Sequence, residues 1–327
     1  MDFLASLPAL LQSSIIAGTN TTDLSSYLQT ALNTHPVVEL PYYNLQIANT
    51  IILNPNQMLR GPMPVRQNMS GLNGTCANLI APSGLTVLQL GCDSLNHSYN
   101  TTLANLAISG GLIGLNMTPA SLLANPPHQA FNIQVLDSYF YCTGPGSANF
   151  QSSTCYERCT FARLDLGRAD YGFQFISNSN KNYNYFDKNL WDQINIFNAN
   201  MNGFNLQASR VCNSNVMRRI NLQSCKQTAF WSSCTFSGLL IESPDTEANG
   251  TPGVTTTDEF YFGAQSQQIQ FVNAVNMAMT SPSAPIRYFI NNSGASSVTL
   301  YNSSWSQPIQ DWAKAVITYV CSGPIVT

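Results

Sequence analysis

The stretch from residue 37 to residue 61 most constrains the fold, because its apolar runs are cut off after only a few residues. The runs are Val-Val-Glu-Leu-Pro, Tyr-Tyr-Asn-Leu-Gln-Ile-Ala-Asn-Thr-Ile-Ile-Leu and Asn-Pro-Asn-Gln-Met-Leu-Arg-Gly, with breaks at Pro41, Asn54-Pro55 and Gly61. Strands this short do not suit the hairpin series of a β-sandwich. They suit a chain that turns a corner after each strand.

A short helix is predicted directly before this stretch. Apolar residues recur there at i, i+3, i+4, i+7 and i+8, which puts them on one helical face: Leu24, Tyr27, Leu28, Ala31 and Leu32. Thr22 or Asp23 stands at the N-cap position. The helix should end between Asn33 and Pro36, because proline cannot continue it.

The order of this helix, "VVELP", "LQIANTIIL" and "MLRG" resembles the start of right-handed parallel β-helix proteins of the pectate-lyase-like class. That class includes viral tailspikes and polysaccharide-degrading enzymes. The resemblance covers about the first fifth of the chain. It implies an all-β fold, a right-handed single-stranded parallel β-helix (a solenoid), with the short helix as its N-terminal cap. We expect this domain to span residues 21–327 and to close with an apolar cap at residues 312–321.

A Gly-apolar-x-apolar-x pattern occurs three times, beginning at Gly172, Gly203 and Gly238. The spacings of 31 and 35 residues indicate similar coils with loops of unequal length. The alternation predicts one set of side chains that points into the core: Phe173, Phe175, Phe204, Leu206, Leu239 and Ile241. No linker interrupts the pattern, so we expect one elongated domain.

Charged residues are scarce, at 9% of the chain against about 25% in ordinary globular proteins. The 13 Lys and Arg and 16 Asp and Glu residues leave a net charge of -3, which argues against nucleic acid as a partner. A surface rich in Asn, Ser, Thr, Gln and Tyr suits carbohydrate contact, and it is equally typical of a solenoid whose stacked turns prefer Asn and Ser. No 18-residue run is apolar throughout, so we do not expect a membrane-spanning segment.

Nine cysteines allow at most four disulfides and leave one thiol over. We predict disulfides ahead of free thiols, although inward-pointing cysteines also serve as small core residues. The chain has no Cys-x-x-Cys pair and only three histidines, so we expect no metal site and no cofactor. Asn-X-Ser/Thr glycosylation sequons are absent between Asn116 and Asn249, which favours a sugar-free lateral face there.

Residues 1–20 stand apart from the coil pattern. Asp2 replaces the basic region of a signal peptide, yet the segment is rich in apolar residues: Phe3, Leu4, Leu7, Leu10, Leu11, Ile15 and Ile16. Such a patch usually marks an interface, so we predict a segment for docking or oligomerisation. The alternative is a helix that only caps the open end of the solenoid.

About half of the charge lies in about a fifth of the chain, since 14 of 29 charged residues fall between Glu157 and Lys226. Tyrosines and tryptophans lie among them, and aromatic faces beside charged groups are suited to saccharide recognition. We predict a ligand-binding site that contains Glu157, Arg168, Tyr171, Trp191 and Arg210. Candidates for a catalytic carboxylate pair, as glycoside hydrolysis requires, are Asp165, Asp170, Asp187 and Asp192. The competing interpretation is salt bridges on a solvated face.

Together with the low charge and the apolar N-terminal segment, the resemblance to the β-helix class implies a viral surface spike or tail-fibre-like structural protein, usually a trimer, that contacts host-surface glycans. Its expected partners are further copies of itself in a homotrimer, other virion proteins bound through the N-terminal segment, and host-surface carbohydrate. Its expected location is the virion surface or the extracellular space. The alternatives are an extracellular polysaccharide depolymerase, hydrolase or lyase, on the same fold, and a purely structural surface protein. The signature residues of polygalacturonases are absent, so we lean away from an enzyme.

Overall fold

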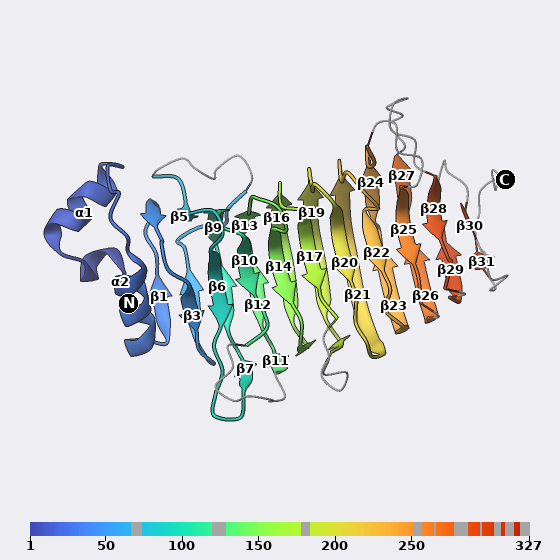
Figure 1. Cartoon of the computed structure of the whole chain (residues 1–327), viewed down its shortest axis with the longest axis horizontal. Coiled ribbons are helices and arrows are strands. Elements are labelled where there is room, and N and C mark those ends of the chain that lie inside the picture. Colours follow the sequence, from blue (N-terminus) through green and yellow to red (C-terminus); the bar gives the residue numbers. More distant parts are fainter. Residues whose placement is uncertain are drawn as a thin grey trace.

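The chain winds into stacked coils that return again and again to the same sheets (Figure 1). This computed structural model describes residues 1–66, 74–119, 129–177, 184–251, 257–264, 266–277, 287–294, 296–303, 309–310 and 317–320. The coils follow one another along a long axis, from the helices α1 (Ala9–Ile16) and α2 (Ser25–Thr34) at one end to β31 (Ile317–Val320) at the other.

Within the described residues the strands form three sheets, which we call sheets A, B and C. Sheet A has 17 strands: β1 Val37–Glu39, β2 Asn44–Gln46, β4 Met58–Arg60, β5 Ala77–Ala81, β8 Thr102–Ala104, β9 Leu106–Gly110, β12 Gln134–Leu136, β13 Tyr139–Tyr141, β16 Thr160–Gly167, β19 Leu190–Phe197, β21 Cys212–Gln223, β23 Phe236–Glu242, β24 Asp245–Glu247, β26 Gln267–Val272, β27 Val275–Met277, β29 Val298–Tyr301 and β31. Sheet B has 10: β3 Ile51–Leu53, β6 Thr86–Leu90, β10 Ile113–Asn116, β14 Ala148–Ser152, β17 Tyr171–Phe175, β20 Asn202–Leu206, β22 Phe230–Ser232, β25 Asp258–Phe262, β28 Tyr288–Asn291 and β30 Ile309–Gln310. Sheet C has 4: β7 His97–Tyr99, β11 Gln129–Phe131, β15 Cys155–Glu157 and β18 Phe186–Asp187.

Neighbouring strands in each sheet are parallel and come from successive coils. In sheet B, Phe173 pairs with Phe204, which pairs with Phe230. Sheet A has two arms in each coil: β12 pairs with the first part of β16, and β13 pairs with its last part. The predicted fold, a right-handed single-stranded parallel β-helix with an N-terminal capping helix, is confirmed.

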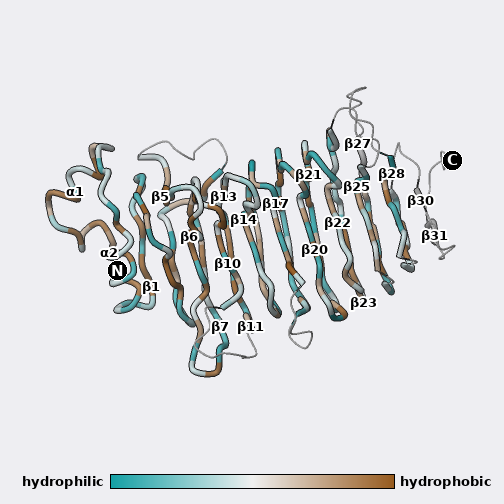
Figure 2. The backbone as a smooth tube through the Cα atoms, in the orientation of Figure 1, coloured by the Kyte–Doolittle hydropathy of each residue, from teal (hydrophilic) through white to brown (hydrophobic). Residues whose placement is uncertain are grey.

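The main core is a continuous apolar cluster along the solenoid axis, and Figure 2 shows hydrophobic and hydrophilic stretches alternating along the coils. A smaller buried cluster lies apart from it: Val65, Cys76, Ala107, Tyr139 and Phe197. All six side chains predicted to point inward are buried. Phe150, Phe173 and Phe204 stack on one another from coil to coil, with ring centroids 4.6 and 5.0 Å apart. Such rows of rings add to the apolar area that each coil buries against the next.

One of the three predicted glycine repeats is out of register with the other two. Gly172 and Gly203 occupy equivalent places in β17 and β20, where a Cβ atom on Gly172 would lie 2.6 Å from the carbonyl oxygen of Gly203. The next equivalent residue is Ala229, because Phe204 pairs with Phe230. Gly238 lies instead in β23 of sheet A and has a positive φ of 80°. The true coil spacing after Gly203 is therefore 26 residues, from 203 to 229, and the predicted spacing of 35 is wrong.

The corner between the two arms of sheet A has left-handed backbone in successive coils. The residues there are Asn105, Asp137, Arg163, Gln193 and Arg219, with φ between 51° and 60°. Non-glycine residues in this conformation cost about 1–2 kcal/mol each. Hydrogen bonds between coils offset part of this cost; for example, the Asp137 amide donates to the Ala162 carbonyl oxygen at 3.0 Å.

The N-terminal segment covers the open end of the solenoid. Residues 1–3 run parallel to β1, since the Phe3 amide donates to the Glu39 carbonyl oxygen at 2.9 Å and the Glu39 amide to that of Met1 at 2.8 Å. A short 3-10 helix, Leu4–Ser6, then leads to α1. Of the apolar residues in this segment, Phe3, Leu7 and Ile15 are buried in the main core. The capping interpretation therefore holds for one face of the segment.

The other face of the segment is exposed, with Leu10 at 87% and Ile16 at 51% of their full accessibility. Docking or oligomerisation through this face stays a prediction. The predicted N-cap, Thr22 or Asp23, is one or two residues too early, because α2 begins at Ser25 and its N-cap is Leu24. Asp23 accepts hydrogen bonds from the amide of Ser25 and from the amide of Ala48, both at 2.9 Å. It thus ties the start of α2 to the first coil.

Two predictions, disulfides between the cysteines and a sugar-free face between the sequons, differ from the structure. The eight described cysteines are all free thiols, and all but Cys92 are buried, so the predicted disulfides are wrong for them. The buried ones serve as small core side chains. Cys321 and most of the predicted C-terminal cap lie outside the described residues.

The sequon asparagines Asn96, Asn249 and Asn291 are buried, so the sequon pattern does not mark out a sugar-free face. Among the described helices, none is both long and apolar enough to cross a membrane.

Candidate functional site

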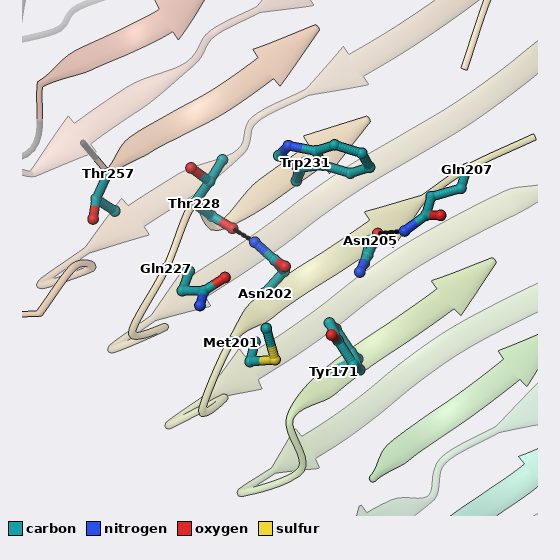
Figure 3. Close-up of a pocket in the computed structure, with 9 residues that line it drawn as sticks. All are labelled: Tyr171, Met201, Asn202, Asn205, Gln207, Gln227, Thr228, Trp231 and Thr257. Atoms are coloured by element: carbon teal, nitrogen blue, oxygen red, sulfur yellow. Dashed lines mark hydrogen bonds between the residues drawn. The ribbon is translucent and has the colours of Figure 1, made fainter. Parts of the chain in front are cut away.

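A groove of about 450 Å³ lies on the outer face of sheet B, across β17, β20 and β22 (Figure 3). We call it the sheet B groove. Its described lining combines aromatic rings with amides and hydroxyl groups: Tyr171, Met201, Asn202, Asn205, Gln207, Gln227, Thr228, Trp231 and Thr257. The groove exists because alternate residues of these strands point outward while their neighbours, such as Phe204 and Phe230, fill the core.

Two asparagines of β20 form the floor. Asn202 donates from Nδ2 to the Thr228 carbonyl oxygen at 2.5 Å, and Asn205 accepts at Oδ1 from Gln207 Nε2 at 3.0 Å. Figure 3 shows both bonds, with Tyr171 and Trp231 on either side of β20. Both asparagines are over 90% buried, at 5% and 7% of full accessibility. Their side chains are thus held in fixed orientations at the bottom of the groove.

Trp231 forms one wall as the last ring of a stack. Its indole lies on the ring of Tyr261 in the next coil, with centroids 5.8 Å apart and planes 9° from parallel. Because Trp231 pairs with Asn205 in the preceding coil, the other face of the indole is turned toward the groove floor. The structure therefore holds an aromatic face next to amide groups, with its orientation fixed from behind.

Tyr171 forms the opposite wall. Burial and the nearby Asp170 carboxylate raise the pKa of its hydroxyl, against a hydrogen bond with the Asn205 side chain that lowers it. The phenol therefore stays protonated at neutral pH and can both donate and accept a hydrogen bond.

The four carboxylates predicted as catalytic candidates do not line this groove. Asp192 forms a two-point ion pair with Arg219, with N–O distances of 2.6–3.0 Å. Asp187 accepts from the backbone amide and the side chain of Asn213 at 2.5 and 3.0 Å. Both side chains link neighbouring coils, but only Asp192 does so through a salt bridge, because the partner of Asp187 is the neutral Asn213.

The other two candidates lie elsewhere. Asp165, on the second arm of sheet A, is nearly buried and accepts from Asn195 Nδ2 at 3.3 Å. Asp170, in the turn before β17, accepts from the Gly146 amide at 2.7 Å. The four carboxylates belong to different strands and turns, and each is bonded to a structural partner. Nothing in these contacts shows an acid and nucleophile pair.

The five predicted ligand-binding residues fall into separate places. Trp191 is fully buried in the core, at 0% accessibility, so its predicted role as a ligand contact is wrong. It points inward because it sits in the row of Phe161 and Met217, which face the axis. Only Tyr171 lines the sheet B groove.

Glu157 and Arg210 do come together, through a residue that joins them. The Tyr185 hydroxyl donates to Glu157 Oε1 at 2.8 Å, and the Arg210 guanidinium lies 5.1 Å from the centroid of the Tyr185 ring. Arg168 lies apart from them, where its Nη1 donates to the Tyr141 hydroxyl at 2.6 Å. In each case the charged group is engaged by a tyrosine of the protein itself.

Sequence analysis missed the larger part of the groove. The predicted site rested on the concentration of charge, whereas Trp231, Asn202 and Asn205 carry none. The available signal was Trp231 itself, which stands between the core residues Phe230 and Ser232 and therefore points outward. Within the described residues, no group of three His, Cys, Asp or Glu side chains is arranged to hold a metal ion.

Comparisons with known proteins yield remote structural likenesses. No model of a protein family and no curated protein sequence matches the chain. The surface protein and adhesin PfbA of Streptococcus pneumoniae is similar over 94% of this chain and 96% of its own, at 8% identity and a TM-score of 0.47. The catalytic domain of a GH87 alpha-1,3-glucanase is similar over 93% and 67%, at 11% identity and 0.46. Tailspike protein 3 of bacteriophage CBA120 is similar over 94% and 60%, at 11% identity and 0.40. At these values the likenesses assign neither a family nor an activity.

Proposed function

We propose that this protein attaches to glycans through the sheet B groove, as the recognition subunit of an exposed surface structure. The observation that carries the proposal is the lining of the groove: two aromatic walls, Tyr171 and Trp231, over a floor of buried amides. Sugar rings present apolar C–H faces and hydroxyl edges. Aromatic side chains take the first, and amide side chains, which both donate and accept, take the second.

The floor is suited to recognition because it is ordered before a ligand arrives. Asn202 uses its Nδ2 on the Thr228 carbonyl, which leaves its Oδ1 as the acceptor for a ligand hydroxyl. The indole of Trp231 is held from behind by Tyr261. Side chains that are already fixed lose little conformational entropy on binding, and this raises affinity for a given set of contacts.

Binding is favoured over cleavage at this groove. Glycoside hydrolysis by the usual route needs two carboxylates on either side of the scissile bond. The described lining has none. The depolymerase alternative would therefore need a different face of the solenoid, and the carboxylates predicted for it are bonded to Arg219, Asn213, Gly146 and Asn195.

In this proposal the protein is a viral spike or tail-fibre subunit, a homotrimer that docks onto other virion proteins by its N-terminal end. The viral assignment is supported by the sequence resemblance. The docking end is supported by exposure: five of the seven exposed large apolar side chains among the described residues lie in the first 63 residues, namely Leu10, Ile16, Tyr27, Tyr42 and Met63.

The test is binding to an array of surface polysaccharides by the wild type and by Trp231→Ala and Tyr171→Ala. Each variant should lose binding by about tenfold or more, equivalent to about 1.4 kcal/mol. Tyr141→Ala is the matched control, because Tyr141 is a partly exposed tyrosine on sheet A that contacts Arg168. Equal binding by all four proteins would rule out the groove. Release of new reducing ends in the same samples would favour the depolymerase instead.

A further inference from the structure

We infer that the sheet B groove selects an uncharged saccharide chain and discriminates against uronic and sialic acids. This inference rests on the proposed function and adds the chemical class of the ligand. It rests on two observations: the described lining has no charged group, and the charged side chains of Lys226 and Asp258 beside it are bonded to residues outside it.

The described lining contains no carboxylate, guanidinium or ammonium group. Its one titratable side chain, Tyr171, has a raised pKa and stays neutral. An anionic sugar that settled on the floor would lose water around its carboxylate without gaining a counter-charge. Burying a charge in this way is costly, whereas a hydroxyl group can replace its water with an amide partner.

Two described charged residues beside the groove, Lys226 and Asp258, have their side-chain hydrogen-bond partners outside its lining. Lys226, next to the lining residue Gln227, donates from Nζ to Asn200 Oδ1 at 2.8 Å. Asp258 pairs with Arg287 through two hydrogen bonds of 3.0 and 2.8 Å. Asp170 directly precedes the wall residue Tyr171, and its negative charge raises the pKa of the Tyr171 hydroxyl. At this wall the local field therefore opposes an anion.

The shape of the groove fits a chain of sugars. Tyr171 pairs with Asn202, and Trp231 pairs with Asn205, three residues further along the same strand. The two walls are thus two strand spacings apart across the sheet, roughly 10 Å, and three residues apart along it, again roughly 10 Å. The resulting diagonal path, on the order of 14 Å by the same spacings, is longer than a single sugar ring. The ligand class is therefore a short run of neutral sugars.

The experiment measures binding of the full chain to neutral probes (dextran, mannan, xylan and chito-oligosaccharides) and to anionic probes (polygalacturonate, alginate and polysialic acid), at low and at physiological ionic strength. Three variants accompany the wild type. Trp231→Ala reports on the groove, Lys226→Glu reverses a charge beside it, and Lys226→Gln controls for loss of the bond to Asn200. Lys226 is exposed and outside the described lining.

The expected result is binding to at least one neutral probe that is lost in Trp231→Ala. It should change by less than about twofold in Lys226→Glu and Lys226→Gln, and stay flat with salt, because screening acts only on charged ligands. Binding to an anionic probe that Trp231→Ala abolishes and Lys226→Glu weakens at low salt overturns the inference while leaving the proposed function standing. Binding that Trp231→Ala does not affect overturns the proposed function and the inference together. A panel in which no neutral probe binds also overturns the inference.

Discussion

The outer faces of sheets A and B differ in the polar side chains that they present. On sheet A, charges are numerous and neutralise one another between coils: Arg163 pairs with Asp137, and Arg219 pairs with Asp192. On sheet B, the outward row through Gln174, Asn205, Trp231 and Tyr261 holds amides and rings. One face is bonded to itself, and the other offers groups that can still bind a ligand.

This difference shows that a concentration of charge need not mark a site. The corner arginines of sheet A stand at left-handed backbone positions, which disfavour any residue with a Cβ atom. Their guanidinium groups reach the aspartates of the preceding coil and so tie neighbouring coils together at the corner. The links between coils account for the charge at these corners. The uncharged groove on sheet B therefore remains the candidate binding face.

Two tryptophans test this comparison with the largest expected effect, because one lies in the core and the other lies on the outer face of sheet B. Trp191 is fully buried and packs on Phe161 at 5.7 Å, so Trp191→Ala should lower the free energy of unfolding by about 3–5 kcal/mol. Trp231 is only partly buried and stacks on Tyr261. Trp231→Ala should therefore lower the free energy of unfolding by less, about 1.5 kcal/mol or below. Urea unfolding measures both. A larger loss from Trp231 would make the groove wall a part of the core and weaken its assignment to binding.

The N-terminal segment also has two faces, and two variants separate them. Phe3→Ala removes a fully buried ring from the end of the core. It should lower the free energy of unfolding by up to about 5 kcal/mol. The exposed pair Leu10→Ser with Ile16→Ser should leave the unfolding free energy within about 0.5 kcal/mol. If this face holds copies of the protein together, the double variant should shift the protein from trimer to monomer in analytical ultracentrifugation. An unchanged assembly state would contradict a role of this face in oligomerisation.

The β-helix was predictable because it depends on local signals. Breaks at Pro41 and Gly61, apolar alternation around Phe173 and Phe204, and an amphipathic helix ending before Pro36 each follow from rules of backbone and side-chain geometry. The register of the coils was harder. Ala229 replaces the glycine of the preceding coils, while Gly238 serves a corner, so a sequence pattern aligned two positions that lie in different sheets.

The candidate site depended on information that the sequence does not display. Trp191 and Trp231 each stand in an alternating strand, and only the register of the strand decides which of them faces the axis. Likewise, Arg163 and Arg219 occupy corners where Asn is the expected residue, because ion pairs to neighbouring coils compensate for the strained backbone. Long-range pairing of this kind is fixed by the stack of coils as a whole.

A smaller effect is expected from Asp23, which joins α2 to the first coil. Partial burial raises its pKa, but hydrogen bonds from Ser25, Ala48 and Asn49 outweigh this and hold the pKa below its ordinary value. Because the folded-state pKa is the lower one, the stabilisation is present above the unfolded-state pKa and is lost as pH falls through the folded-state pKa. Asp23→Ala should cost about 0.5–2 kcal/mol at neutral pH, the range for losing a side chain that accepts bonds from backbone amides at the start of a helix. The difference from wild type should shrink on acidification to below pH 4, roughly the ordinary aspartate pKa, in urea unfolding curves. A pH-independent difference would mean that the carboxylate charge is not involved.

A small change in stability is also expected from Asp192→Asn on sheet A. The pair with Arg219 is well formed, but the arginine side chain is 55% exposed, so solvent screens the pair and its loss should cost about 0–1 kcal/mol. Glycan binding should not change at all, because Asp192 lies outside the described lining of the groove. Asp187→Asn is the companion variant, since this side chain also links coils, through Asn213. If either variant abolishes binding while its unfolding curve matches the wild type, the charged face contains a ligand site after all. The division of the surface into a self-bonded sheet A and a ligand-binding sheet B would then be wrong.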